Sequence, residues 1–190
     1  MVYVFDVDDT LSDTNLGTEK YILNYFKTNN LPYKMVHKYA KYADYKFDWS
    51  EEVAKDWFHE NSDEMMLNFK VKKNVKKVLE FLRKNGDKIV IATARDYVWH
   101  KNPEQTTSTW MKNKKLPYDK IYVNTYEKQD VCIAENADVF VDDSLEMCEK
   151  VAKRSNAKVF LITTGYNKDF SLPENISRIS DISEILTYKK

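Results

Sequence analysis

Five short apolar runs limit the folds that this chain can adopt, and they span residues 2–5, 89–92, 121–123, 139–141 and 159–162. Each run is continuous rather than alternating with polar residues, which is typical of strands buried on both faces of a parallel sheet. Helical patterns separate the later runs. One spans residues 75–82 and ends before Gly86, and others are predicted to begin near Pro103 and Ser144. This alternation predicts an α/β fold with a doubly wound, Rossmann-like parallel sheet.

The segment from residue 15 to residue 70 differs, because it shows no strand pattern and is rich in aromatic residues. Ser50 and Ser62 are each followed by two acidic residues, a pattern typical of a helix start. We expect several short helices that form a cap, 15–70, over the site of a core domain, 1–14 and 71–190. Core packing is favoured over stacking on a ligand's base for its aromatics, among them Tyr45, Phe47, Trp49, Trp57 and Phe58.

Composition argues against several classes of protein. The 190 residues contain 30 Lys and Arg against 30 Asp and Glu, so no basic excess indicates a nucleic acid polymer as partner. Three glycines are too few for a glycine-rich nucleotide-binding loop. Two cysteines without a C-x-x-C pair predict neither a disulfide framework nor a zinc site. No run approaches the ~20 apolar residues of a membrane span, so we expect a cytoplasmic protein with no membrane partner; its oligomeric state stays open.

Carboxylates follow the first and the fourth apolar runs. Asp6 and Asp8 come directly after the first run, and Asp142 and Asp143 come directly after the fourth. Asp6 can attack a phosphate ester, while Asp8 can protonate the leaving oxygen and then deprotonate the water that cleaves the intermediate. Together with Asp6, the second pair forms an oxygen-rich pocket that suits Mg²⁺. The sequence thus predicts a metal-dependent phosphate-transfer site.

A second set of residues can bind the phosphoryl group. The run at 89–92 leads into Thr93, Ala94 and Arg95, which offer a hydroxyl, backbone N–H groups and a guanidinium. Arg95 can equally pair with its neighbour Asp96. Lys128 is the best-placed lysine before the fourth strand to offset the aspartate charges, although many lysines compete. The lysines at 72–73 and 76–77 are interpreted as solvent-exposed helix faces.

In this order and at these strand ends, the four segments resemble those of haloacid dehalogenase (HAD) superfamily phosphatases. Residues 6–10 match the first motif of that family, Thr93 the second, Lys128 the third and 142–143 the fourth. The resemblance covers the core and implies an aspartyl-phosphate mechanism. It also implies Mg²⁺ bound by the Asp6 side chain, the Asp8 carbonyl oxygen and Asp142, with Asp143 outside the direct ligands or bound through water.

One residue departs from the family pattern and bears on phosphate binding. Asp9 stands where many relatives have glycine, and we expect it to be tolerated because aspartate adopts turn conformations readily. Asp9 is also a candidate contact to the substrate phosphate, together with the donors at residues 93–95 and Lys128.

The segments at 93–95, 109–111 and 116–119, followed by Lys128, are similar to those of 5′-nucleotidase and 5′(3′)-deoxyribonucleotidase-like members of the superfamily. This resemblance implies a Mg²⁺-dependent 5′-nucleotidase whose substrate is a nucleoside or deoxynucleoside monophosphate. The cap carries no recognisable nucleotide-binding motif, so a phosphatase for sugar phosphates or other small metabolites is the alternative. A non-enzymatic nucleotide-binding module is a third hypothesis, disfavoured because such a module has no use for Asp8 as an acid.

Overall fold

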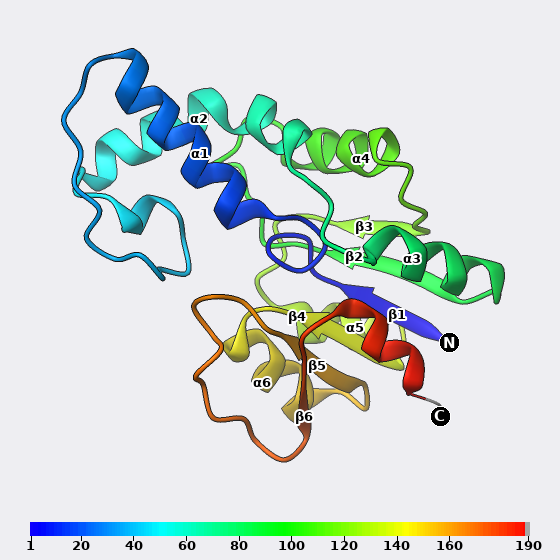
Figure 1. Ribbon diagram of the computed structural model, residues 1–190. Helices are drawn as coiled ribbons and strands as arrows, with labels where there is room; N and C mark the ends of the chain where they lie inside the picture. Colours follow the sequence, from blue (N-terminus) through cyan, green and yellow to red (C-terminus); the bar gives the residue numbers. More distant parts are fainter. Residues whose placement is uncertain (189–190) are drawn as a thin grey trace.

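The computed structural model describes residues 1–188, and its centre is a sheet in which every neighbouring pair of strands is parallel (Figure 1). Its six strands lie in the order β3-β2-β1-β4-β5-β6, which confirms the predicted doubly wound α/β fold. The five predicted strands are present within one residue of their expected bounds. The strands are Val2–Phe5 (β1), Lys88–Ala92 (β2), Lys120–Tyr122 (β3), Val139–Asp142 (β4), Lys158–Ile162 (β5) and Ile176–Ile179 (β6).

The sixth strand, β6, was not predicted. Its sequence places Ser177 and Arg178 between two isoleucines, so it has no continuous apolar run. It lies at the edge of the sheet beside β5, where these two polar side chains are only half-buried. An edge strand needs less apolar surface than a central one, which is why the pattern missed it.

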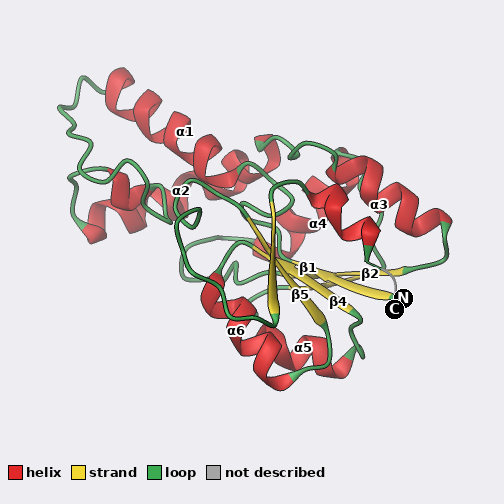
Figure 2. Ribbon diagram, turned by 60° about the horizontal axis from the view of Figure 1, so that its bottom comes forward, coloured by secondary structure: helices red, strands yellow, loops and turns green. Residues whose placement is uncertain are grey.

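Helices cover both faces of the sheet, as Figure 2 shows, with α3 and α4 on one side and α5 and α6 on the other. Side chains of β1 alternate between the two faces: Tyr3 and Phe5 join the core under α3 and α4, and Val4 joins the core under α5 and α6. The helices of the described chain are Thr14–Thr28 (α1), Glu51–Asn68 (α2), Val75–Lys84 (α3), Pro103–Asn113 (α4), Lys128–Ala134 (α5) and Leu145–Arg154 (α6), with 3₁₀ turns at Asp44–Lys46 and Ile182–Thr187.

The insertion after β1 contains two long helices, α1 and α2, rather than the several short helices expected. Ser50 is the N-cap of α2, and its Oγ accepts the Val53 N–H at 3.3 Å. The helix start predicted at Ser62 is wrong, because α2 continues through it and buries its side chain. Burial of Met65 and Met66 on the same helix stabilises the continuous form, so tertiary packing overrides the local start signal.

Most of the aromatic residues in the insertion build a core of their own. Phe47 and Trp57 are 3% and 6% exposed, and Trp49 and Phe58 pack against them. Tyr45 is the exception among the five candidates, since it is 54% exposed. Core packing therefore accounts for four of the five.

Specific contacts hold the insertion against the rest of the chain. Asp63 on α2 accepts hydrogen bonds from Asn102 Nδ2 at 2.9 Å and Thr106 Oγ1 at 3.2 Å. The buried Trp110 on α4 donates its indole N–H to the Phe69 carbonyl at 3.0 Å. Within the insertion, the Phe69 ring lies so close to Gly17 that a Cβ atom at residue 17 would sit 2.5 Å from it. Among residues 1–188, no helix has both the length and the apolar character to cross a membrane.

Candidate active site

Three aspartates meet where the strand order of the sheet reverses. Asp6 follows β1 and Asp142 ends β4, and these neighbouring strands are the point from which the chain winds in two directions. Ligands of open α/β sheets bind at the carboxyl ends of the strands at such a point. One carboxylate oxygen from each of Asp6, Asp142 and Asp143 lies within 4.8 Å of the others. All three side chains are buried.

Lys128 is the lysine that the fold brings to these aspartates. It is the first residue of α5, and its Nζ donates to Asp6 Oδ1 at 2.6 Å and to Asp142 Oδ2 at 2.7 Å. The lysine side chain is 4% exposed. Asp142 also accepts the Ser144 N–H through Oδ1 at 2.7 Å. The ammonium is thus fixed between the carboxylates that follow β1 and β4.

The electrostatics of this cluster favour a divalent cation. Burial raises the pKa of Asp6 to about 7, against the lowering influence of Lys128 and with a further increase from Asp142. Burial and the charges of Asp142 and Asp6 raise the pKa of Asp143 well above its ordinary value. Three buried carboxylates are therefore offset by a single ammonium. Hard oxygen donors at this spacing suit Mg²⁺, and such a cation removes the repulsion that raises these pKa values.

Asp8 points to a different partner from the other aspartates. Its carboxylate receives two hydrogen bonds from Arg95, Nε to Oδ2 at 2.8 Å and Nη2 to Oδ1 at 2.6 Å, and a third from Thr14 Oγ1 at 2.7 Å. Burial by itself raises the pKa of Asp8, but Arg95 and Thr14 outweigh it and lower the pKa to about 2. Asp8 is thus held as a carboxylate in this arrangement.

Arg95 is buried and does not pair with Asp96, the alternative considered from the sequence. Its Nη1 donates to Thr107 Oγ1 at 3.1 Å, while Asp96 accepts the N–H groups of Val98 and Trp99 instead. The planar guanidinium of Arg95 donates two parallel hydrogen bonds to one carboxylate, and a phosphoryl group can accept the same pair of hydrogen bonds.

Asp9 occupies a left-handed backbone conformation with a φ of 55°, which explains how aspartate replaces glycine there. Its Oδ1 accepts the Asn15 N–H at 3.0 Å, and its carbonyl oxygen accepts from Lys72 Nζ at 2.6 Å. Burial raises the pKa of Asp9 to about 6, against the lowering effects of Asn15 and Lys72. Lys72 is therefore half-buried and bound to the loop after β1, and the expectation of a solvent-exposed lysine is wrong for it.

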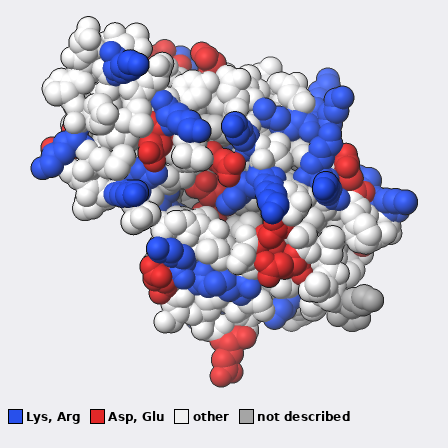
Figure 3. All heavy atoms as spheres, in the orientation of Figure 1, with Lys and Arg blue, Asp and Glu red and all other residues white. Residues whose placement is uncertain are grey.

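The loop after β2 lies at the same edge of the sheet. Thr93 is fully buried, and its Oγ1 accepts the Arg95 N–H at 3.4 Å. Ala94, between them, is half-buried. The structure therefore places all nine predicted site residues at the carboxyl ends of β1, β2, β3 and β4: Asp142 is the last residue of β4, and the other eight lie on the loops and helix starts that follow the strands. Figure 3 shows acidic atoms near the middle of this face with lysine and arginine atoms around them.

Several residues near the aspartates were not predicted. Tyr166, in the loop after β5, donates its hydroxyl to Asp143 Oδ2 at 2.8 Å, and Lys41 of the insertion donates to Ser144 Oγ at 3.0 Å. Burial and the Asp143 charge raise the pKa of Tyr166, which keeps it a hydrogen-bond donor. Asn15 donates its side-chain N–H groups to the carbonyls of residues 40 and 41 at 3.1 and 2.7 Å. No spacing rule could reveal these residues, since each comes from a loop or insertion distant in sequence from its partner.

The chain is similar to known proteins in its structure but not in its sequence. No protein-family model and no curated protein sequence matches the chain. Solved structures do match over almost the whole length. A predicted phosphatase from Clostridium acetobutylicum superposes with a TM-score of 0.66 at 18% identity, covering 98% of this chain and 96% of the other.

Two further structures match over the same extent. A HAD-hydrolase from Bacillus subtilis bound to magnesium has a TM-score of 0.65 at 13% identity, with 98% of this chain and 96% of the other covered. A predicted phosphoglycolate phosphatase from Haemophilus somnus has a TM-score of 0.60 at 16% identity, with the same coverage. The chain has the haloacid dehalogenase-like fold. Its helical insertion after β1 is part of that HAD-like architecture.

Proposed function

We propose that this protein is a Mg²⁺-dependent phosphatase that hydrolyses a small phosphorylated metabolite through an aspartyl-phosphate on Asp6. The observation that carries the proposal is the cluster of Asp6, Asp142 and Asp143 around Lys128, with Asp8 two residues from the proposed nucleophile. Its HAD-like fold is shared with a predicted phosphoglycolate phosphatase and with a HAD-hydrolase bound to magnesium, which supports both the reaction and the metal.

In the first step, an Asp6 carboxylate oxygen attacks phosphorus, and the bond from phosphorus to the ester oxygen breaks. Asp8 gives its proton to that leaving oxygen. In the second step, Asp8 takes a proton from a water molecule whose oxygen attacks the same phosphorus. The bond to Asp6 then breaks, which releases inorganic phosphate and restores the carboxylate. Lys128 stabilises the negative charge on the phosphoryl oxygens throughout.

The metal is proposed to be held by the carboxylates of Asp6, Asp142 and Asp143, with the Asp8 carbonyl oxygen as the further ligand that the family resemblance implies. Mg²⁺ supplies charge neutralisation between the carboxylates and the phosphoryl oxygens. The oxygen spacing in the cluster favours a more direct role for Asp143 than the outer position expected from the resemblance.

Asp8 has to carry a proton to act as an acid, yet Arg95 holds it ionised. We infer that the phosphoryl group of the substrate attracts the guanidinium of Arg95 away from Asp8, because a phosphoryl group and a carboxylate accept the same pair of hydrogen bonds. Release from Arg95 then removes the interaction that lowers the pKa of Asp8. We propose that Thr93, Ala94 and Asp9 also donate hydrogen bonds to this phosphoryl group.

The test is phosphate release from a panel of sugar phosphates, other small phosphate esters and nucleoside 5′-, 3′- and 2′-monophosphates. Each is assayed with Mg²⁺, with chelator, and with Asp6→Asn. We expect Mg²⁺-dependent release that Asp6→Asn lowers at least about 10³-fold. Asp56→Asn, which changes an exposed aspartate on α2, is the matched control and should retain full activity. Full activity of Asp6→Asn would refute the mechanism, and binding without release would favour the non-enzymatic module.

A 5′-nucleotidase is the second candidate, and one observation favours it. An open hollow of about 880 Å³ on the insertion is lined in part by the aromatic side chains of Tyr39, Tyr45 and Phe47. Tyr39 and Tyr45 are exposed and can stack on a base. Preference for a subset of 5′-monophosphates over every small ester in the panel would decide for this candidate.

A further inference from the structure

A small cavity adjoins the aspartate cluster and has a basic lining. Its volume is about 190 Å³, and its walls come from the loop after β1, the insertion and the loop after β5. Asp9 and Tyr166 are part of the wall, and Tyr166 is bonded to Asp143 at 2.8 Å. The cavity therefore begins beside the residues proposed to bind the reacting phosphoryl group.

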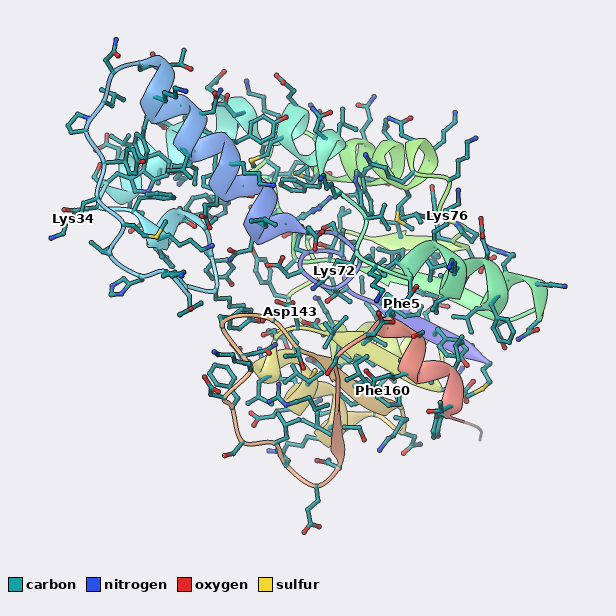
Figure 4. All side chains as sticks on the ribbon, viewed as in Figure 1. Phe5, Lys34, Lys72, Lys76, Asp143 and Phe160 are labelled. Atoms are coloured by element: carbon teal, nitrogen blue, oxygen red, sulfur yellow. The ribbon has the colours of Figure 1, made fainter. Side chains whose placement is uncertain are left out.

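Three lysines line this cavity, and two of them have no carboxylate partner. Lys46 is paired with Glu19 at 2.5 Å. Within residues 1–188, neither Lys38 nor Lys72 forms an ion pair. Lys72 donates to the Asp9 carbonyl, and Lys38 lies over the Tyr39 ring at 5.4 Å from its centroid. Figure 4 shows Lys72 toward the middle of the molecule, whereas Lys34 projects outward at the far end of the insertion.

Two other polar residues of the wall, Thr164 and Asp9, do not neutralise these lysines by an ion pair. The Oγ1 atom of Thr164 is buried without a hydrogen-bond partner in the described chain, although Thr164 lines the cavity. Asp9 is the acidic residue of the lining, and its Oδ1 is turned to the Asn15 N–H. A buried hydroxyl without a partner is costly unless a ligand or water supplies one. The cavity wall thus carries two ammonium groups that form no ion pair within residues 1–188, those of Lys38 and Lys72, and the second is held in place by the Asp9 carbonyl oxygen.

The volume limits what can enter. At ~30 Å³ for each water molecule, the cavity holds roughly six, which is room for one anionic group and a few carbon atoms. Pockets for larger organic ligands begin at about 300 Å³.

We propose that this cavity binds a second anionic group, a carboxylate or a phosphate, at the far end of a short substrate whose other end is the phosphate ester. This inference rests on the proposed phosphatase function and adds the substrate class: short-chain phosphate esters with a distal negative charge. Lys38 and Lys72 bind the distal group. The site favours esters with an anionic end over those with a neutral end, because only an anion gains Coulomb attraction to the two lysines.

Three esters with one carbon chain test the proposal: an alkyl phosphate, the matching carboxyalkyl phosphate and the matching diol bisphosphate. We expect kcat/KM of the wild type to be about tenfold or more higher for the two esters with an anionic end, mainly because their KM is lower. A tenfold ratio corresponds to the free energy of one charge-assisted hydrogen bond. The ratio of kcat/KM for the carboxyalkyl phosphate to kcat/KM for the diol bisphosphate identifies which anion the cavity prefers. Equal kcat/KM for all three, or a preference for nucleoside 5′-monophosphates over all three, would overturn the proposal.

Two lysines contact the same ring and provide a matched pair of variants. Lys168 also lies 5.4 Å from the Tyr39 ring centroid but does not line the cavity. Lys38→Met should abolish most of the preference and Lys38→Arg should restore it, whereas Lys168→Met should leave it unchanged. Equal loss in Lys38→Met and Lys168→Met would show only a general surface charge effect and would overturn the assignment.

Binding separates failure of the cavity from failure of the phosphatase proposal. Calorimetric titration of the diol bisphosphate into wild type and Lys38→Met, with chelator present, needs no turnover. If no ester is hydrolysed but binding depends on Lys38, the phosphatase proposal fails and the anion site stands. If esters are hydrolysed and the bisphosphate binds both proteins equally, the phosphatase proposal stands and the anion site is refuted.

Discussion

Lys128→Met is the substitution that most directly probes the charge balance of the site. The Lys128 ammonium lies 2.6 Å from Asp6 Oδ1 and 2.7 Å from Asp142 Oδ2, and the three side chains are at most 5% exposed. At an effective dielectric constant of about 20, each contact corresponds to roughly 6 kcal/mol of attraction. Relief of the lysine's desolvation offsets part of that. We expect a net loss of about 3–5 kcal/mol of unfolding free energy at pH 8 in chelator, as found when one partner of a buried pair is removed.

The loss should depend on pH with a definite sign. The pKa of Asp6 is already raised to about 7 by burial, and loss of Lys128 removes a lowering influence and raises it further. A raised carboxyl pKa destabilises the fold where the unfolded chain is ionised, so the penalty is complete above the folded pKa and disappears as pH falls toward about 4. The variant should therefore differ less from wild type at pH 5 than at pH 8. Mg²⁺ should recover part of the loss, since it replaces the missing charge.

Urea denaturation followed by circular dichroism measures these differences, at pH 5 and pH 8, with chelator and with Mg²⁺. Lys120→Met is the control, because Lys120 pairs with Glu135 at 2.9 Å but is 52% exposed. The Lys120→Met substitution should lower the free energy of unfolding by about 0–1 kcal/mol. A Lys128→Met loss below about 1 kcal/mol at pH 8 in chelator, or an equal loss at both pH values, would refute the reasoning.

Three further substitutions test other parts of the structure. Trp57→Ala should lower the free energy of unfolding by about 3–5 kcal/mol in urea titrations and reduce kcat/KM equally for all esters; a change of selectivity without a change of stability would show instead that Trp57 contacts substrate. Asp9→Asn should raise stability by about 1–2 kcal/mol at pH 8 and not at pH 4, since burial raises the pKa of Asp9 to about 6; a gain at both pH values would contradict this. Gly17→Ala should cost about 1–3 kcal/mol in thermal melts, because its Cβ would lie 2.5 Å from the Phe69 ring, and an unchanged melting temperature would show that Phe69 moves freely.

Local pattern is sufficient for the elements whose apolar residues are adjacent in sequence. Strands β1 and β4 are continuous apolar runs, and a strand delivers whatever follows it to one edge of the sheet. For this reason the sequence alone predicts that Asp6, Asp142 and Asp143 lie together. Ser62 illustrates the limit: the same helix-start signal that marks Ser50 lies in the middle of α2, where burial of neighbouring side chains decides the outcome.

The sequence by itself determined the parallel α/β sheet and the carboxylates at its strand ends, because strand propensity and side-chain order act over a few residues. Only the tertiary structure decided which cationic side chain binds which carboxylate: Lys128 binds Asp6 and Asp142, and Arg95 binds Asp8. It also brought Lys38, Lys72 and Thr164 to one cavity from three separate segments. Long side chains on distant loops meet only after the sheet and the insertion have packed, and no local spacing encodes that meeting.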